Sequence, residues 1–296
     1  MNRQSSSNNI FRTTTTKAPR SSRTTTTRRS SFQPSSEICG VDGPQETIFG
    51  GQEAEGRFPF MVALINRGTG SSFCGGVMVT RKHVLTAAHC FDHKEWRNVD
   101  VRIGQYDLQE DEDPDTEANI RNVKIHEQYE PSGKKGRVTP INDIAIVSLD
   151  KVITSRKVTT ICLPSTTRDV TKLDDKPIAA GWGLTRRTRR GKSETKLRYA
   201  KLEVYGKNEC QRKYSEFLRD GFEINDNMVC AGNDITDTCR GDSGGPLMYL
   251  SSWTNYRWEI YGIVSFGPTI CANPEYPGVF TRVDKHLDWI QRNTKI

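Results

Sequence analysis

The feature that most constrains the fold is a succession of short apolar runs after residue 47, separated by Gly, Pro, Asn and Asp. Most of these runs are too short for a buried helix but long enough to contribute to a strand. No internal repeat of fixed period is present. Many short strands joined by turn residues are typical of a β-barrel or β-sandwich. The clearest runs are residues 60–65, 77–79, 144–149, 178–180 and 258–266.

Helical spacing of apolar residues appears in only two places, within residues 214–218 and 287–290. The second of these lies near the end of the chain. The sequence therefore predicts an all-β protein that closes with a C-terminal helix.

The first 38 residues have a different composition. Seventeen of residues 1–36 are Ser or Thr and almost none are apolar, so this segment cannot bury enough surface to offset its ordering entropy. We expect residues 1–38 to be a disordered linker of a kind that is often O-glycosylated outside the cell. No apolar stretch resembles a signal peptide, which predicts an incomplete N-terminus for a secreted protein.

Charge and cysteine content narrow the class of protein. The net charge of +7 is concentrated in residues 1–47, which carry +4, so the nearly balanced remainder gives little support for nucleic-acid binding. No run of about 18 apolar residues predicts a membrane-spanning helix. The eight cysteines show no CxxC spacing and favour four disulfides in an oxidising compartment over zinc or redox chemistry. Their spacing alone leaves 105 pairings open.

Three local clusters carry residues suited to nucleophilic catalysis. They are residues 85–90 (LTAAHC), 142–147 (NDIAIV) and 237–246 (DTCRGDSGGP). Taken singly, His89 is typical of a structural histidine and Asp143 of an ordinary turn residue. Glycine turns do not explain why a serine, two acids and a cysteine share the third cluster.

In the order His, Asp, Ser, these clusters resemble the signature of the chymotrypsin-like (trypsin-type) serine proteases. The resemblance covers residues 39–296 and includes the motifs IFGG at 48–51, AGWG at 180–183 and PGVF at 277–280. It implies two six-stranded antiparallel Greek-key β-barrels with the active site between them. The implied domains are the linker 1–38, an activation segment 39–47 and a protease domain 48–296.

The resemblance implies a role for each catalytic residue. Ser243 would be the nucleophile, His89 its general base, and Asp143 the acid that fixes the imidazole tautomer. The backbone N–H groups of Gly241 and Ser243 would bind the oxyanion. Asp242 would pair with the new amino group of Ile48 after activation.

The same resemblance assigns the substrate pocket. Asp237, six residues before Ser243, matches the pocket base, where a carboxylate attracts Arg or Lys. Gly267 and Gly278 match the pocket walls. Ser265 begins the strand that would hydrogen-bond an extended substrate, and Phe266 stands where many relatives have Trp.

Family pairing implies four disulfides, one of which tethers the activation segment to the protease domain. They are Cys39–Cys162, Cys74–Cys90, Cys210–Cys230 and Cys239–Cys271.

The resemblance implies no cofactor for the reaction. Acidic residues between positions 105 and 117 lie where many relatives bind calcium, but Gln105 stands where those relatives usually place Glu, so a solvated acidic loop is the alternative. The basic residues at 186–192 indicate a solvated loop prone to self-cleavage or, alternatively, a polyanion-binding exosite.

The linker, the Cys39 tether and the phrase ICLP at 161–164 look like arthropod clip-domain proteases of clotting and immune cascades. Residues 1–38 hold no cysteine, so we expect no clip domain in this chain. This implies a secreted zymogen whose partners are protein substrates, an upstream activating protease and serpin-type or other inhibitors. A catalytically silent homologue that acts as a cascade cofactor is the alternative, and such proteins usually lose the serine that this chain keeps. A third hypothesis is that the chain is a polyanion-binding module.

One segment departs from the family pattern. Most relatives carry Arg or Lys before the mature N-terminus, whereas Thr47 precedes Ile48 here and no base lies between Cys39 and Ile48. We therefore expect that a trypsin-like enzyme, including this one, cuts the Thr47–Ile48 bond very poorly.

Overall fold

The computed structural model describes most of the chain after residue 37, and all the described residues belong to one compact unit, residues 34–296. The described residues are 38–42, 56–92, 95–110, 113–133, 139–164, 176–184, 194–215, 222–233, 238, 240–251, 256–268 and 275–295. Residues 1–37 of the predicted linker 1–38, Ile48, the basic residues 186–192, Asp237 and the Cys239–Cys271 pair lie outside them.

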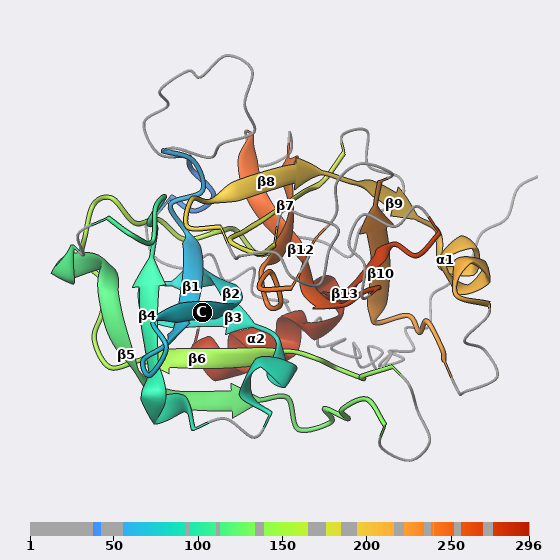
Figure 1. Ribbon diagram of the computed structural model, residues 1–296, viewed down its shortest axis with the longest axis horizontal. Helices are drawn as coiled ribbons and strands as arrows, with labels where there is room; N and C mark the ends of the chain where they lie inside the picture. Colours follow the sequence, from blue (N-terminus) through green and yellow to red (C-terminus); the bar gives the residue numbers. More distant parts are fainter. Residues whose placement is uncertain are drawn as a thin grey trace, which may run out of the picture. The chain divides into compact units, whose positions relative to one another are not determined.

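Six antiparallel strands close the first barrel in the order β1-β2-β3-β6-β5-β4 (Figure 1). Strand β1 is buried over five of its six residues and pairs with β2 on one side and β4 on the other, which closes the barrel. The strands are β1 Met61–Asn66, β2 Ser71–Thr80, β3 His83–Thr86, β4 Val99–Ile103, β5 Glu117–Ile125 and β6 Ala145–Leu149. Short 3-10 turns η1 Ala88–Phe91, η2 Trp96–Asn98 and η3 Pro114–Thr116 join them.

The second sheet has seven strands in the order β8-β7-β11-β12-β13-β10-β9. Its two outermost strands, β8 and β9, are the halves of one segment that is interrupted only at Leu202. Leu202 lies opposite Pro177 in the β7–β8 register and donates its N–H to Pro177 O at 2.8 Å. Pro177 has no N–H to donate in return, so the regular ladder ends here. The strands are β7 Ile178–Gly181, β8 Arg198–Lys201, β9 Glu203–Tyr205, β10 Met228–Gly232, β11 Pro246–Ser251, β12 Arg257–Phe266 and β13 Gly278–Arg282.

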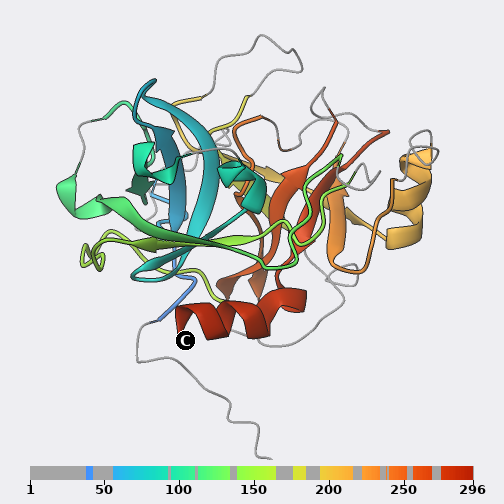
Figure 2. The same cartoon turned by 90° about the horizontal axis from the view of Figure 1, so that it is seen from below.

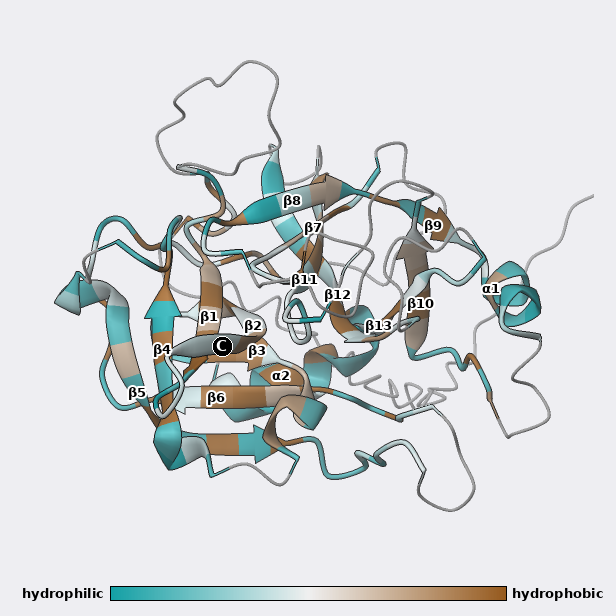
Figure 3. Cartoon of the chain, in the orientation of Figure 1, coloured by the Kyte–Doolittle hydropathy of each residue, from teal (hydrophilic) through white to brown (hydrophobic). Residues whose placement is uncertain are grey.

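Strand β12 lies between the two hydrophobic cores. Its sequence is an almost unbroken apolar run for this reason. Trp258 and Ile260 belong to the core cluster of the first barrel, whereas Tyr261 and Val264 pack in the cluster inside the second sheet. A strand buried on both faces shows no alternation of polar and apolar residues. Strand β4 alternates instead, with Val99, Val101 and Ile103 inside, and the hydropathy colours of Figure 3 follow the same pattern.

The C-terminal helix connects the two halves of the unit. It is α2 Leu287–Thr294, and it follows the turn η8 Asp284–His286 at the end of the second sheet. Figure 2 shows α2 running beneath the strands. Its buried residues Trp289 and Ile290 pack in the first barrel's core cluster, so the end of the chain ties one half to the other.

Three of the four expected disulfides are present in the described residues: Cys39–Cys162, Cys74–Cys90 and Cys210–Cys230. The first spans 123 residues and holds the segment before Ile48 against the domain. The backbone of Gly40 supports this tether, because its N–H donates to Thr160 O at 2.6 Å and its carbonyl accepts from Trp258 N at 2.9 Å.

The all-β architecture with a C-terminal helix is confirmed, and the first barrel has the expected six strands. The second sheet has seven strands instead of the expected six because the break at Leu202 divides one strand into β8 and β9. The other helix, α1 Lys207–Lys213, lies earlier than the helical spacing of residues 214–218 predicts. Tyr214 is its C-cap, and residues 216–221 lie outside the described part of the chain. In the residues that the structure covers, no helix is long and apolar enough to cross a membrane.

Candidate active site

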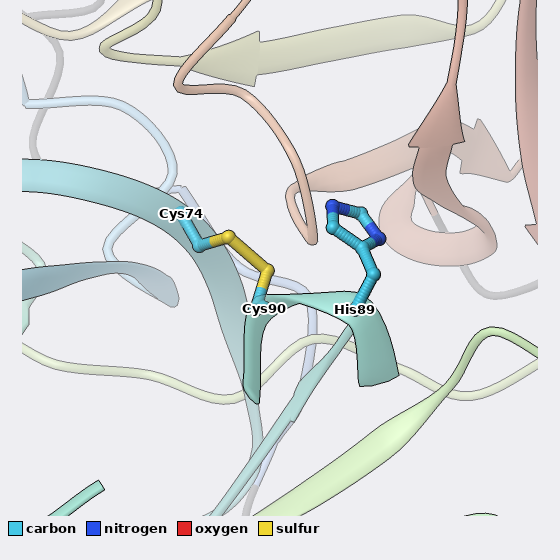
Figure 4. A group of neighbouring side chains, drawn as sticks. All are labelled: Cys74, His89 and Cys90. Atoms are coloured by element: carbon cyan, nitrogen blue, oxygen red, sulfur yellow. A yellow bond between two sulfur atoms is a disulfide. The ribbon is translucent and has the colours of Figure 1, made fainter. Parts of the chain in front are cut away.

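His89 lies on the short turn η1, directly after β3. The register of β3 against β6 ends at Thr86, and the Cys74–Cys90 disulfide then fastens the turn to β2. The side chain of His89 is 29% exposed. Figure 4 shows its imidazole projecting from the turn that carries the disulfide.

Asp143 precedes β6 and is 1% exposed. Its Oδ2 lies 2.7 Å from His89 Nδ1, and its Oδ1 accepts the backbone N–H of His89 at 2.9 Å. A carboxylate next to Nδ1 favours the imidazole tautomer whose Nε2 carries no hydrogen. His89 can therefore act as a base through Nε2.

Two residues of the second sheet complete the surroundings of Asp143. Ser265 Oγ donates to Asp143 Oδ2 at 2.5 Å, and Thr281 Oγ1 donates to the Asp143 carbonyl at 2.9 Å. The pairing of β12 with β13 shifts register between Val264 and Phe266, and such an irregularity redirects the side chain that it contains. The sequence placed Ser265 on the substrate strand but gave no sign of this bond to the acid.

Ser243 lies in the loop before β11, held between both halves of the unit. Its carbonyl accepts the N–H of Gly75 on β2 at 2.7 Å, and the N–H of Gly244 donates to Val264 O at 2.9 Å. Gly244 has φ +79°, and a Cβ there would lie 2.2 Å from Thr86 Oγ1. Only glycine fits this position, so the serine turn can approach the first barrel closely.

Asp242 packs against two glycines of the segment around β7. The N–H of Gly183 donates to Asp242 Oδ1 at 2.8 Å. A Cβ on Gly181 or Gly183 would lie within 2.4 Å of the Asp242 carboxylate. Gly241, at φ +100°, would bring a Cβ to 3.0 Å from Gly183 Cα. The AGWG motif is therefore glycine-rich because it receives the Asp242 side chain.

Gly267 and Gly278, the predicted pocket walls, lie against each other: an ideal Cβ on Gly267 would be 3.6 Å from Gly278 Cα. Gly278 begins β13, and Gly267 follows β12.

A second acid, Asp92, lies near His89 and is not marked by any motif in the sequence. Tyr129 donates its hydroxyl to Asp92 Oδ2 at 2.6 Å, and the N–H of Asp92 bonds to His89 O at 3.2 Å at the end of the turn. Burial, this hydrogen bond and the nearby charges of Asp143 and Asp92 raise the pKa of Tyr129 well above its usual value. Tyr129 therefore stays protonated. Asp92 is three residues from His89, but no local pattern links it to Tyr129, 37 positions away.

One cluster resembles a metal site but is not one. Potential ligand atoms of Cys74, His89 and Cys90 lie within 4.8 Å of one another. The two sulfur atoms are bonded to each other (Figure 4), so neither is a thiolate that could bind a metal.

In the segment 105–117, Arg102 contacts one acid of the predicted calcium site, Glu117, and the nearby carbonyl of Leu108. Arg102 Nη1 donates to Leu108 O at 2.7 Å, and Arg102 Nε lies 3.1 Å from Glu117 Oε1. Gln105 Oε1 is buried and has no hydrogen-bond partner in the described residues. A guanidinium group can satisfy carboxyl oxygen atoms without a metal, and the calcium site and the solvated acidic loop both stay predictions.

The fold and the site together define a two-barrel β-protein of the chymotrypsin-like class. The sequence profile of the trypsin family matches residues 48–290. Phenoloxidase-activating factor 3 of Holotrichia diomphalia is 33% identical over 285 residues, which cover 90% of this chain and 78% of that protein.

CLIP domain-containing serine protease HP8 of Bombyx mori is 33% identical over 88% of this chain and 73% of its own length. The proclotting enzyme of Tachypleus tridentatus is 36% identical over 86% of this chain and 68% of its own length. The chain therefore belongs to the trypsin family of serine proteases.

Proposed function

We propose that this chain is a secreted trypsin-like serine endopeptidase, made as a zymogen, that cleaves peptide bonds after Arg or Lys. The observation that carries the proposal is the double contact between His89 and buried Asp143, on a turn whose Cys90 Sγ lies 3.8 Å from the carbonyl oxygen of Ser243. A serine hydroxyl alone is a poor nucleophile near neutral pH, and a neutral imidazole is the base that can activate it.

In the proposed reaction, Ser243 Oγ attacks the scissile carbonyl carbon while His89 Nε2 takes its proton. Asp143 stabilises the resulting imidazolium. The imidazolium then returns the proton to the leaving amine as the C–N bond breaks, which leaves an ester between the substrate acyl group and Ser243. Water, activated by His89 in the same way, hydrolyses the ester. The side chains supply the nucleophile, acid and base, so the reaction needs no cofactor.

The negative charge that develops on the carbonyl oxygen needs preorganised donors. We assign this role to the backbone N–H groups of Gly241 and Ser243. The positive φ of Gly241 supports the assignment, because this conformation lets a tight turn direct successive N–H groups to one side. The position of Asp242 against Gly183 supports its pairing with the amino group of Ile48.

The preference for Arg or Lys rests on Asp237, with Gly267 and Gly278 leaving room for a long side chain. The names of the relatives, an activating factor of phenoloxidase and a proclotting enzyme, support a place in an extracellular cascade. The partners would then be protein substrates, an upstream protease and serpin-type inhibitors. The basic loop 186–192 would be the site for a polyanion.

The test is hydrolysis of peptide amides with Arg, Lys or Phe before the scissile bond, by protein cut before Ile48. Rapid cleavage of the Arg and Lys substrates but not of the Phe substrate is expected. No cleavage of any substrate by correctly cut protein would favour the silent homologue instead.

A further inference from the structure

The residue before Asp143 has an unusual backbone conformation. Asn142 has φ +49°, one of four positive values at non-glycine residues in the described chain, with Phe58, Tyr256 and Lys295. This left-handed region is unfavourable for most residues with a Cβ atom, and Asn is one of the few that adopt it when its side chain is hydrogen-bonded. The N–H of Ile144 bonds to Asn142 O at 2.8 Å and closes a tight turn around Asp143. The position of Asp143 therefore depends on how Asn142 is held.

The side-chain amide of Asn142 has a partner at each end. Its Nδ2 donates to the backbone carbonyl of Gln128 at 3.1 Å, and its Oδ1 accepts from Asn227 Nδ2 at 3.0 Å. A backbone carbonyl can only accept, so Gln128 decides which end of the amide carries the hydrogen atoms. Asn227 then has to donate.

These partners come from different halves of the unit. Gln128 follows β5 of the first barrel, and Asn227 directly precedes β10 of the second sheet. Asn227 is itself fixed, since its N–H bonds to Asn225 Oδ1 at 2.9 Å and its carbonyl accepts from Arg282 N at 2.8 Å. The amide pair therefore spans the two halves next to the acid.

His286 also approaches this amide, with Nε2 3.1 Å from Asn142 Oδ1 and Nδ1 2.7 Å from Arg282 O. Both neighbours are acceptors, and a neutral imidazole has only one N–H. Burial lowers the pKa of His286, opposed by the Arg282 carbonyl and Asp284. We assign the single N–H of neutral His286 to Nδ1, which faces the closer Arg282 carbonyl. Asn227 is then the donor to Asn142.

We propose that Asn142 and Asn227 are positioning residues for Asp143. The hydrogen bond between their side-chain amides holds Asp143, which belongs to the first barrel, in place relative to the second sheet. The strands of that sheet precede and follow Ser243 in the chain. Without this bond Asn142 relaxes from its left-handed conformation, and the Asp143 carboxyl group turns away from His89. The catalytic consequence rests on the proposed function, whereas the geometric consequence does not.

Two variants test the contribution of the side-chain amide separately from that of the backbone conformation. Asn142→Gly keeps access to positive φ but removes the amide, and Asn227→Ala removes only the partner. Asn233→Ala is the matched control, because this half-buried asparagine at the other end of β10 bonds to Lys201 O instead. Tyr256→Gly is a second control that relieves a left-handed residue on an exposed turn, where Tyr256 is 70% exposed.

On activated enzyme, Asn142→Gly and Asn227→Ala are expected to lower kcat roughly 10- to 100-fold, the effect of a misplaced catalytic group, with KM changed less than about threefold. The double variant should be no worse than the more impaired single variant, because both remove one interaction. Both controls should match the wild type. Full kcat in Asn142→Gly and Asn227→Ala, or independent losses that multiply in the double variant, would overturn the proposal.

A spectroscopic readout keeps this inference separate from the proposed function. In intact, uncut chain carrying Ser243→Ala and ¹⁵N-labelled histidine, the proton between His89 Nδ1 and Asp143 gives an NMR signal that is sharp while the bond protects it from exchange with water. We expect Asn142→Gly and Asn227→Ala to broaden or abolish this signal, and the controls to keep it. An unchanged signal in both variants would refute the positioning role, even if the enzyme itself proved inactive.

Discussion

Asp143 holds His89 at two points, through a hydrogen bond from the backbone N–H to Oδ1 at 2.9 Å and a contact between ring Nδ1 and Oδ2 at 2.7 Å. One contact fixes the turn η1 and the other fixes the ring. Because Ser265 shares Oδ2, the acid is oriented from the second sheet while it orients a histidine of the first barrel.

Asp143→Asn tests this double contact. The amide is almost the same size, so we expect the fold to persist, but an amide nitrogen facing Nδ1 reverses the tautomer of His89. The expected loss in kcat is about four orders of magnitude, the figure already established for this change in the family. Steady-state kinetics on activated variant would measure it, with circular dichroism as the check on folding. A loss of less than tenfold would mean that another acid supports His89.

The preference for cationic substrates is tested by Asp237→Ser. An Arg side chain in a pocket without its carboxylate is desolvated and unpaired, which costs several kcal/mol or roughly three orders of magnitude in kcat/KM. Asp234→Ser is the matched control, since it removes an acid three positions earlier in the sequence. If the Asp237 variant still cleaved Arg amides at the wild-type rate, the assignment of the pocket base would be wrong.

Activation at Ile48 should require a protease of different specificity. Incubation of the uncut chain with trypsin should release little Ile48 terminus, because Thr47 offers no cation to the trypsin pocket. Thr47→Arg should make trypsin an efficient activator, and Thr47→Gln should not. N-terminal sequencing is the measurement, and efficient release of Ile48 from the wild-type chain would contradict the expectation.

Stability should depend on pH through buried His286, which is 4% exposed. Burial lowers the pKa of this histidine below its ordinary value of about 6.5. Below about pH 6.5 the unfolded chain therefore binds a proton that the folded chain does not. The free energy of unfolding then decreases as the pH is lowered, until the pH reaches the pKa of His286 in the folded chain. Urea unfolding at pH 7.5 and 5.5 should show a smaller loss for His286→Gln than for the wild type. Equal losses would mean that His286 is not linked to folding in this way.

The parts of the fold that were predictable are those with local causes. Residues 60–65, 144–149 and 258–266 read as strands because they are apolar and bounded by turn residues, and they form β1, β6 and most of β12. The break at Leu202 was not predictable, because it depends on which residue of another segment, Pro177, lies opposite it.

In the candidate active site, too, the features with local causes were predictable and those that depend on distant residues were not. His89, Asp143 and Ser243 stand in recognisable local motifs, and the structure joins the first two directly. The bonds of Ser265 and Thr281 to Asp143 cross 122 and 138 residues, and the left-handed backbone of Asn142 depends on partners in three separate segments. Contacts of this kind arise from the packing of the two halves and leave no pattern in the sequence.

Covalent labelling tests whether Ser243 is a nucleophile that His89 activates. Protein cut before Ile48 would be treated with a fluorophosphonate, which reacts with activated serines, and the modified peptide would be identified by mass spectrometry. We expect one adduct on Ser243, which should be absent from His89→Ala and Ser243→Ala and much slower to form in the uncut chain. An adduct elsewhere, or none on correctly cut wild-type protein, would contradict it.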